Sequence, residues 1–462
     1  MNEAKGELSK SLSPDIVALD EHEIPQNLAK WRKWLAVLVI SASSLCITCT
    51  STLAAFAEVG IASEFKVKKI VSVLSVSLFI EGLGIGPLIV GPLSEVFGRN
   101  PIYRASYVLL FAFSWAVAFA PDIVFRLFTG LCGAAFLSVA GGSVTDLFSD
   151  REVATPMAIY TISPFLGPVI GPLISGFINQ HLEWRWTFYL VIAWSFAQLV
   201  ALYLCVPETF VPVLLKRKVR KLAAQNRENL QKRRLASDQQ RNPDQLLYSF
   251  QTYLVGQNGV HAGYMVVMGI LYLSFQVYPI IFEQQHGFNL QETGLGFLGI
   301  GVGLLMGLAT QPLWNRFHDR ITERNNGKLP PEARLYMGQV GGICIPVSLF
   351  WLAFTTYPSV HWIVPIIASV PFGAGIYFVY TSTFTYLVTA YRPVAASAMA
   401  GNSAMRATFG AVFPLFAGAM YTRLGTVGAT ALLAGLMTLI APLPFVIARI
   451  GPSLRRQSRF AV

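Results

Sequence analysis

Gly91-Pro92-Leu93-Ser94-Glu95-Val96-Phe97-Gly98-Arg99-Asn100-Pro101 is a short polar turn between two long apolar runs, residues 69–92 and 101–120. Each run supplies the roughly 20 residues that an α-helix needs to cross a bilayer core of about 30 Å. A helix is expected in each run, because backbone polar groups that face lipid must be paired within their own segment. The stretch therefore predicts two membrane-spanning helices joined by a loop at one face of a membrane.

The same alternation of apolar runs and short polar loops continues along most of the 462 residues. Hydrophobic residues make up 54% of the chain and charged residues only 13%, against about 25% charged residues in soluble proteins. This composition excludes collagen-like and disordered classes and predicts an all-α polytopic membrane protein. Twelve runs are long enough to span a bilayer: 34–57, 69–92, 101–120, 122–147, 154–178, 186–206, 258–282, 292–314, 335–356, 362–388, 396–420 and 427–448.

The distribution of Lys and Arg predicts the orientation of these spans. With both termini in the cytoplasm, 28 of these residues fall on the inner side and 5 on the outer side, while Arg126 and Arg406 lie within spans. Such an excess follows the positive-inside rule. We therefore expect both termini to be cytoplasmic, in a multi-pass protein of the plasma membrane or, as the alternative, of the vacuolar membrane.

Charged segments divide the chain into five parts. Residues 1–33 hold six acids and no apolar core, which predicts a disordered cytoplasmic N-tail rather than a signal peptide. Six-helix halves are expected at 34–206 and 251–448, followed by a cytoplasmic C-tail at 449–462. The cytoplasmic linker at 207–250 carries ten basic residues, and contact with an anionic inner leaflet explains this charge without a nucleic-acid partner.

The two halves show a weak internal repeat. At a constant offset of 220, three residues recur in place: Pro92, Leu93 and Phe97 match Pro312, Leu313 and Phe317. Two related six-helix halves around a midplane cavity form a common architecture of secondary transporters. We therefore expect two pseudo-symmetric halves, twelve transmembrane helices in total, and a monomer.

Two motifs resemble signatures of the major facilitator superfamily. In the turn, Gly91 and Gly98 permit close backbone approach, and Glu95 and Arg99 can form a gating latch. In span five, Gly167-Pro168-Val169-Ile170-Gly171-Pro172 combines proline bends with small packing residues and resembles the antiporter signature. Together with residues 184–189, 207–209 and 357–365, these motifs are similar to fungal twelve-span drug:proton antiporters. That family includes multidrug, polyamine and secondary-metabolite exporters, so the resemblance implies proton-coupled efflux.

The chain departs from that family at several positions. Glu95 stands where the family has Asp, and Asn100 stands where it has a further basic residue. The stretch 121–126 is shorter than its counterpart, which predicts that Arg126 lies nearer the outer mouth. The region 245–260, at the start of span seven, matches poorly.

Three charged residues within spans are candidates for proton coupling or substrate binding. Glu81 lies ten residues before Gly91, about 15 Å along a helix, and therefore near the midplane. A midplane charge is costly and indicates function unless a neighbouring hydroxyl or Arg accounts for it. Arg126 begins a stretch that resembles the span-four signature whose arginine is tied to proton coupling. Arg406 is the other embedded cation, and either arginine can instead neutralise a helix end.

The sequence also gives expectations for the transported compound and for catalytic, metal and cofactor sites. Four aromatic residues of spans seven and ten can line a cavity for flat compounds or pack against other helices: Tyr272, Phe275, Tyr377 and Tyr380. We expect no catalytic, metal or cofactor site, because the sequence has no P-loop and no catalytic or metal-ligand cluster. We predict a proton-coupled exporter of a small organic compound, such as a drug, secondary metabolite or organic acid, that works by alternating access. The alternatives are a proton-coupled importer of the same fold, for a sugar or another nutrient, and a non-transporting membrane receptor.

Overall fold

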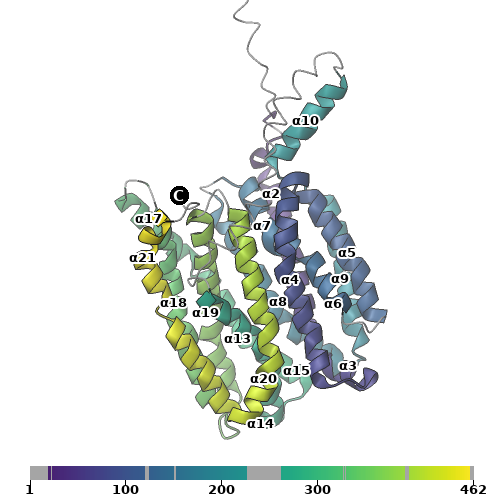
Figure 1. Ribbon diagram of the computed structural model, residues 1–462, viewed down its shortest axis with the longest axis vertical. Helices are drawn as coiled ribbons and strands as arrows, with labels where there is room; N and C mark the ends of the chain where they lie inside the picture. Colours follow the sequence, from purple (N-terminus) through teal and green to yellow (C-terminus); the bar gives the residue numbers. More distant parts are fainter. Residues whose placement is uncertain are drawn as a thin grey trace, which may run out of the picture.

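The computed structural model describes residues 19–21, 23–119, 124–149, 152–225, 262–325, 327, 329–390 and 395–457. Their secondary structure is helical, and no strand occurs among them. Figure 1 shows the long helices standing side by side in one bundle, from which α10 projects at one end.

The N-terminal part of the bundle begins after a short 3-10 helix, η1 (Pro25–Asn27). It contains α2 (Lys30–Leu53), α3 (Glu58–Phe65), α4 (Lys69–Phe97), α5 (Arg99–Phe119), α6 (Val124–Gly133), α7 (Ala135–Leu147), α8 (Ala154–His181), α9 (Arg185–Cys205) and α10 (Val211–Gln225). The predicted fourth span is divided between α6 and α7. The first part of the predicted linker is helical, as α10, and the rest of that linker lies outside the described residues.

The C-terminal part contains the remaining helices. They are α13 (Ala262–Tyr278), η2 (Pro279–Glu283), α14 (Gln284–His286), α15 (Leu290–Gly296), α16 (Leu298–Ala309), α17 (Gln311–Arg324), η3 (Pro331–Arg334), α18 (Leu335–Phe354), α19 (Ile363–Ala390), α20 (Ala395–Ile440) and α21 (Leu443–Gln457). The poorly matching region 245–260 lies outside the described residues, as does most of the N-tail.

Eleven helical stretches in the described part of the chain are long and apolar enough to cross a membrane. The last stretch, Met399–Ser453, contains both predicted spans 396–420 and 427–448. Gly425 separates the two, because its φ of 71° and ψ of 170° are not helical. Glycine adopts such a positive φ without the steric cost that a Cβ atom would bring. The structure therefore agrees with the predicted all-α bundle of twelve spans.

The two ends of the bundle differ in charge. We call the end that carries the start of α2, the end of α17 and α10 the basic end, because Lys30, Arg324 and the Lys and Arg residues of α10 lie there (Figure 1). The opposite, distal end carries α3, α14 and α15 (Figure 1). This division matches the strong bias of Lys and Arg in the sequence.

Glycine rows determine how closely the helices pack. In α16, a Cβ atom added at Gly303 would clash with the Val370 carbonyl oxygen, and one added at Gly307 would lie 2.9 Å from the Tyr377 ring. The glycine-bearing face of α16 is thus its contact face with α19. On the outside of the bundle, large apolar side chains such as Leu204 and Leu439 are 80% and 81% exposed, as expected for helices that face lipid.

Candidate substrate and coupling site

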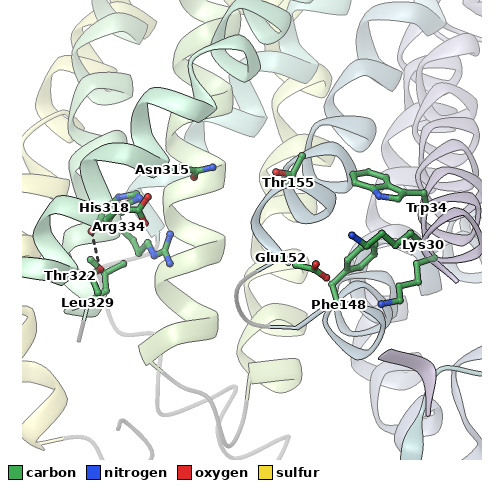
Figure 2. Close-up of a pocket in the computed structure, with 12 residues that line it drawn as sticks. Lys30, Trp34, Phe148, Glu152, Thr155, Asn315, His318, Thr322, Leu329 and Arg334 are labelled. Carbon is green, nitrogen blue, oxygen red and sulfur yellow. Dashed lines mark hydrogen bonds between the residues drawn. The ribbon is translucent and has the colours of Figure 1, made fainter. Parts of the chain in front are cut away.

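A cleft of about 760 Å³ separates the two parts of the bundle at the basic end. One wall is formed by Lys30, Lys33, Trp34, Phe148, Glu152 and Thr155, and the other by Asn315, His318, Asp319, Thr322, Leu329 and Arg334. Figure 2 shows the labelled members of these two groups facing each other from opposite sides. The cleft therefore lies between the N-terminal and the C-terminal halves rather than within one of them.

At the distal end the two halves are in close contact. A Cβ atom added at Gly176 of α8 would lie 2.8 Å from the Leu290 carbonyl oxygen of α15. The Leu290 amide donates to Gln180 Oε1 at 3.2 Å, and His181 Nε2 lies 3.0 Å from Gln291 Oε1. The bundle is thus open between its halves at the basic end and closed at the distal end.

A buried carboxylate takes part in this distal closure. Glu58 of α3 is 4% exposed, and its Oε1 and Oε2 accept hydrogen bonds from Gln276 Nε2 of α13 at 2.9 and 3.0 Å. Glu58 belongs to the N-terminal half and Gln276 to the C-terminal half. The sequence interpretation missed this pair because Glu58 follows directly after an apolar run and therefore resembles an ordinary span-end acid.

Arg406 of α20 lies where the two halves meet, and it is 5% exposed. Its guanidinium lies over three aromatic rings, 5.4 Å from the centroid of Phe384, 5.5 Å from that of Tyr380 and 5.9 Å from that of Phe165. Phe165 of α8 stacks on Tyr380 of α19 with centroids 4.5 Å apart. The Nη2 atom donates to Ser403 Oγ at 3.3 Å, whereas Nη1 has no hydrogen-bond partner among the described residues.

The predicted cavity aromatics occupy different positions. Tyr272 reaches across the halves, with its hydroxyl 3.1 Å from Ser51 Oγ. Tyr380 stacks on Phe165 beside Arg406. Phe275 stacks on Phe297, with centroids 5.2 Å apart, within the C-terminal half. The Tyr377 hydroxyl donates to Gln311 Oε1 at 2.8 Å, also within that half. Tyr272 and Tyr380 are thus brought to the boundary, whereas Phe275 and Tyr377 pack within their own half.

Arg126 is buried inside the N-terminal half. It is 3% exposed, its Nε donates to Ser75 Oγ at 3.2 Å, and its Nη2 donates to the Thr50 carbonyl at 3.4 Å. The rings of Phe79 and Phe188 lie 5.0 and 5.4 Å from the guanidinium carbon. Arg126 is the third residue of α6, and Thr50 and Ser75 lie near the distal ends of α2 and α4, so the prediction that it lies towards the outer mouth is not contradicted. The side chain is nevertheless enclosed by these helices and the two rings.

Glu81 lies on the outer seam between α4 and α20. Its Oε1 accepts a hydrogen bond from Thr408 Oγ1 at 3.2 Å, and the side chain is only partly buried. Ile85 and Ile89, which follow on the same face of α4, are 40% and 48% exposed. The predicted midplane carboxylate thus contacts a hydroxyl of the other half on the lipid-facing surface, away from Arg406 and its aromatic rings.

The glycine-rich turn forms a network within the N-terminal half. Arg99 donates from Nε to Asp146 Oδ2 at 3.3 Å, from Nη1 to Ser94 Oγ at 2.8 Å, and from its backbone N–H to Glu208 Oε1 at 2.9 Å. Gly98 has a φ of 100°, and a Cβ atom there would clash with Glu208, whereas Gly91 has open space around it. These contacts of Arg99 are with Asp146, Ser94 and Glu208, all on the N-terminal side of the chain, and the gating role predicted for Glu95 and Arg99 between the halves stays a prediction.

The antiporter motif packs α8 against α2. A Cβ atom at Gly167 would clash with Thr48 and lie 2.8 Å from the Cys49 amide nitrogen, and one at Gly171 would clash with the Thr52 hydroxyl. Pro168 and Pro172 lie inside α8 without ending it. A Cβ atom added at Gly294 of α15 would lie 2.7 Å from the Pro172 carbonyl oxygen. The motif therefore joins close packing within one half to the distal contact between the halves.

Ion pairs lie outside the spans at both ends of the bundle. At the distal end, Arg185 Nη1 donates to Glu64 Oε2 at 2.8 Å, and this guanidinium, assisted by the Trp184 indole, lowers the pKa of Glu64. At the basic end, Lys218 Nζ lies 2.8 Å from Glu23 Oε2 and 2.9 Å from Asp20 Oδ2. The lysine lowers the pKa of Glu23 and fastens α10 to the segment that precedes α2. In the described part of the chain, no group of three or more His, Cys, Asp or Glu side chains is placed to hold a metal ion.

A helical bundle of two halves with a cleft open at one end is the architecture of a secondary transporter. Residues 38–414 match the family model of the Major Facilitator Superfamily. The chain belongs to this superfamily. It is a multi-pass membrane protein that transports small molecules, and the predictions of family, fold and non-enzymatic transport are confirmed.

Individual relatives support the same assignment. The chain is 38% identical to "Efflux pump atB" of Aspergillus terreus over 96% of this chain and 88% of that protein. It is 34% identical to "Probable drug/proton antiporter YHK8" of Saccharomyces cerevisiae over 100% and 91% of the two chains. Among solved structures, the inward-open xylose transporter XylE from E. coli matches with a TM-score of 0.62 at 14% identity, covering 91% of this chain and 98% of that one. At this identity the likeness to XylE concerns the fold alone.

Proposed function

We propose that the protein is a proton-coupled efflux transporter that exports a small organic compound by alternating access. The observation that carries the proposal is the arrangement of the halves, which are apart at the basic end, in contact at the distal end, and meet at Arg406 in between. A cleft that opens to one side presents a binding site to one side at a time. Membership of the superfamily and relatives named as efflux pumps and as a drug/proton antiporter support export coupled to protons.

The proposed orientation places the basic end and both termini in the cytoplasm, because 28 Lys and Arg residues fall on that side and 5 on the other. The cleft then faces the cytoplasm, from which an exporter takes its substrate. We place the protein in the plasma membrane, with the vacuolar membrane as the alternative, and as a monomer. Lys218 is paired with acids of the N-tail, and we propose that the basic linker contacts anionic lipid of the inner leaflet.

Proton coupling requires a group whose protonation changes the balance between two states. Glu58 meets this requirement, because its carboxylate holds Gln276 of the other half in the closed distal end. Protonation of Glu58 removes the charge that strengthens these two hydrogen bonds and so favours opening of that end. Arg126 is proposed to shape the half on which Glu58 lies, and Glu81 is proposed to act as a seam contact.

The experiment that tests this function is transport in membrane vesicles. Metabolites in the medium of cells with and without the gene identify an exported compound, whose uptake is then measured in inverted plasma-membrane vesicles under an imposed pH gradient. Uptake should require a vesicle lumen more acidic than the outside, and a protonophore should abolish it. Uptake that survives the protonophore and follows added ATP contradicts the proposal. Gradient-driven accumulation only in right-side-out vesicles supports the importer instead.

A further inference from the structure

Arg406 is a buried cation whose hydrogen-bonding capacity is only partly used. A guanidinium carries five N–H donors in a planar fork. Of these, one on Nη2 is directed to Ser403 Oγ, and Nη1 has no partner among the described residues. No ion pair joins Arg406 to a carboxylate in the part of the chain that the structure describes. The fork therefore retains donors that match the two oxygens of a carboxylate.

The surroundings of Arg406 are flat and apolar. The rings of Phe165, Tyr380 and Phe384 face its guanidinium at 5.4 to 5.9 Å and stabilise the charge through their π-systems without occupying its N–H donors. Phe165 and Tyr380 stack at an interplanar angle of 27°, and they belong to different halves. When the halves separate at this level, the stack opens into two parallel ring faces beside a cation.

Arg406 and these rings lie deeper in the bundle than the cleft, along its direction. Thr155 lines the cleft, and Phe165 lies ten residues further along α8, about 15 Å deeper in the bundle. The cleft walls carry Lys30, Lys33 and Arg334 against the acids Glu152 and Asp319, so the approach has an excess of positive charge. An anion that enters from the basic end is attracted through the cleft towards Arg406. A cation is repelled both in the cleft and at Arg406.

From these observations we propose that the transported compound is a planar organic anion, with its carboxylate on the Arg406 guanidinium and its conjugated ring between Phe165 and Tyr380. The proposal rests on the proposed transport function and adds the chemical class of the substrate. Arg406 provides the charge selectivity and the two rings provide the preference for flat molecules. Both determinants come from residues that lie far apart in sequence, on α8, α19 and α20.

A binding experiment tests the site without requiring transport. The full-length protein in lipid nanodiscs is titrated with 2-naphthoate, with its neutral isostere 2-naphthamide and with the non-planar anion cyclohexanecarboxylate, and binding is followed by thermal shift and calorimetry. The wild-type protein should bind 2-naphthoate at least tenfold more tightly than either analogue. Equal binding of the naphthoate and the naphthamide by wild-type protein overturns the proposal, whatever the variants do.

Variants then assign the selectivity to residues. Arg406→Gln should remove the preference for naphthoate over naphthamide, and Phe165→Leu should remove the preference for naphthoate over cyclohexanecarboxylate. Arg423→Gln on the same helix, where the side chain is exposed, should change neither ratio. If Arg406→Gln keeps the full charge preference, the site lies elsewhere and the proposal fails. Selective binding together with absence of pH-driven transport would leave this site in place and remove the proposed function.

Discussion

Arg126 and Arg406 are both buried arginines in membrane-spanning helices, yet their surroundings differ in kind. The contacts of Arg126, with Ser75, Thr50 and two rings, all come from the N-terminal half. Those of Arg406 come from both halves. Since the halves move relative to each other during alternating access, the surroundings of Arg406 change in each cycle and those of Arg126 do not. Contacts within a half therefore hold that half together as a rigid body. Contacts between the halves differ from one conformation of the transport cycle to the next.

Helix α8 shows the same difference along a single helix. Gly167 and Gly171 pack against α2 inside the N-terminal half, where even one added carbon atom would clash. Phe165 and Gly176, on the same helix, contact α19 and α15 of the other half. One face of α8 is thus packed against α2 of its own half. The other face contacts α15 and α19 of the half that moves relative to it.

The largest effect is expected from overpacking the rigid face, with Gly171→Leu. The leucine side chain has to displace Thr52 and α2, and overpacking of this kind typically costs about 1–3 kcal/mol. The same displacement moves Phe165 and Gly176, on the other face of α8, relative to the C-terminal half, so part of the cost differs between the conformers. A difference of about 1.4 kcal/mol shifts their equilibrium about tenfold, so transport should fall strongly while much of the protein remains in the membrane.

Gly418→Leu is the matched control for this variant, because nothing lies within 4 Å of a Cβ atom added at Gly418. That variant should transport nearly as well as the wild-type protein. Vesicle transport and the amount of protein in the membrane are measured for both variants. Full transport by Gly171→Leu at normal abundance would show that close packing within the half is dispensable.

A smaller but still large effect is expected from Arg126→Lys. The guanidinium donates to Ser75 on α4 and to Thr50 on α2 from separate nitrogen atoms, and one ammonium group cannot reproduce this planar fork. We expect transport to fall by about tenfold or more, nearly as far as with Arg126→Ala, since a lost charged hydrogen bond is typically worth about 1.5–3 kcal/mol. Near-normal pH-driven efflux and counterflow with Lys would show that charge alone suffices at this position and that the planar fork of Arg126 is not needed to shape the half.

Between the halves, Glu58→Gln should separate exchange from coupling. The glutamine oxygen can still accept from Gln276, so the distal end should close, but it no longer responds to protons. Counterflow of labelled substrate should persist within about threefold, because a neutral hydrogen bond contributes about 0.5–1.5 kcal/mol, whereas accumulation driven by a pH gradient should disappear. Glu64→Gln, at the exposed distal ion pair with Arg185, is the control that should retain accumulation. Retained accumulation in Glu58→Gln would exclude this carboxylate as the proton carrier.

The sequence predicts the contacts within a half better than those between halves. Apolar run length predicted the spans, and Gly167 and Gly171 in the span-five motif predicted a closely packed helix face, because both patterns are local. The partner of Glu58 lies 218 residues away, and Phe165 meets Tyr380 only through the assembly of the halves. No local sequence pattern indicates a contact between residues so far apart in the chain. The same limit applies to Arg99, whose contacts with Asp146 and Glu208 lie 47 and 109 residues away in the sequence.

The smallest effect is expected from Glu81→Gln, one of the three residues that the sequence indicates as candidates for proton coupling or substrate binding. In the structure its carboxylate meets Thr408 of the other half at 3.2 Å on the lipid-facing seam, and Ile85 and Ile89 on the same face are well exposed. The neutral hydrogen bond that a glutamine would make with Thr408 is worth about 0.5–1.5 kcal/mol.

Glutamine keeps the acceptor for the Thr408 hydroxyl, so pH-driven efflux and counterflow should both stay within about twofold of the wild-type values. Thr408→Val, which removes the same hydrogen bond from the other half, should reproduce any residual change, since both substitutions act on one contact. If accumulation is instead lost in Glu81→Gln and retained in Thr408→Val, the carboxylate carries the proton itself. The contact between α4 and α20 would then take part in proton coupling. In that case, contacts at the outer surface of the bundle would control the conformation of the protein as well as those at its centre.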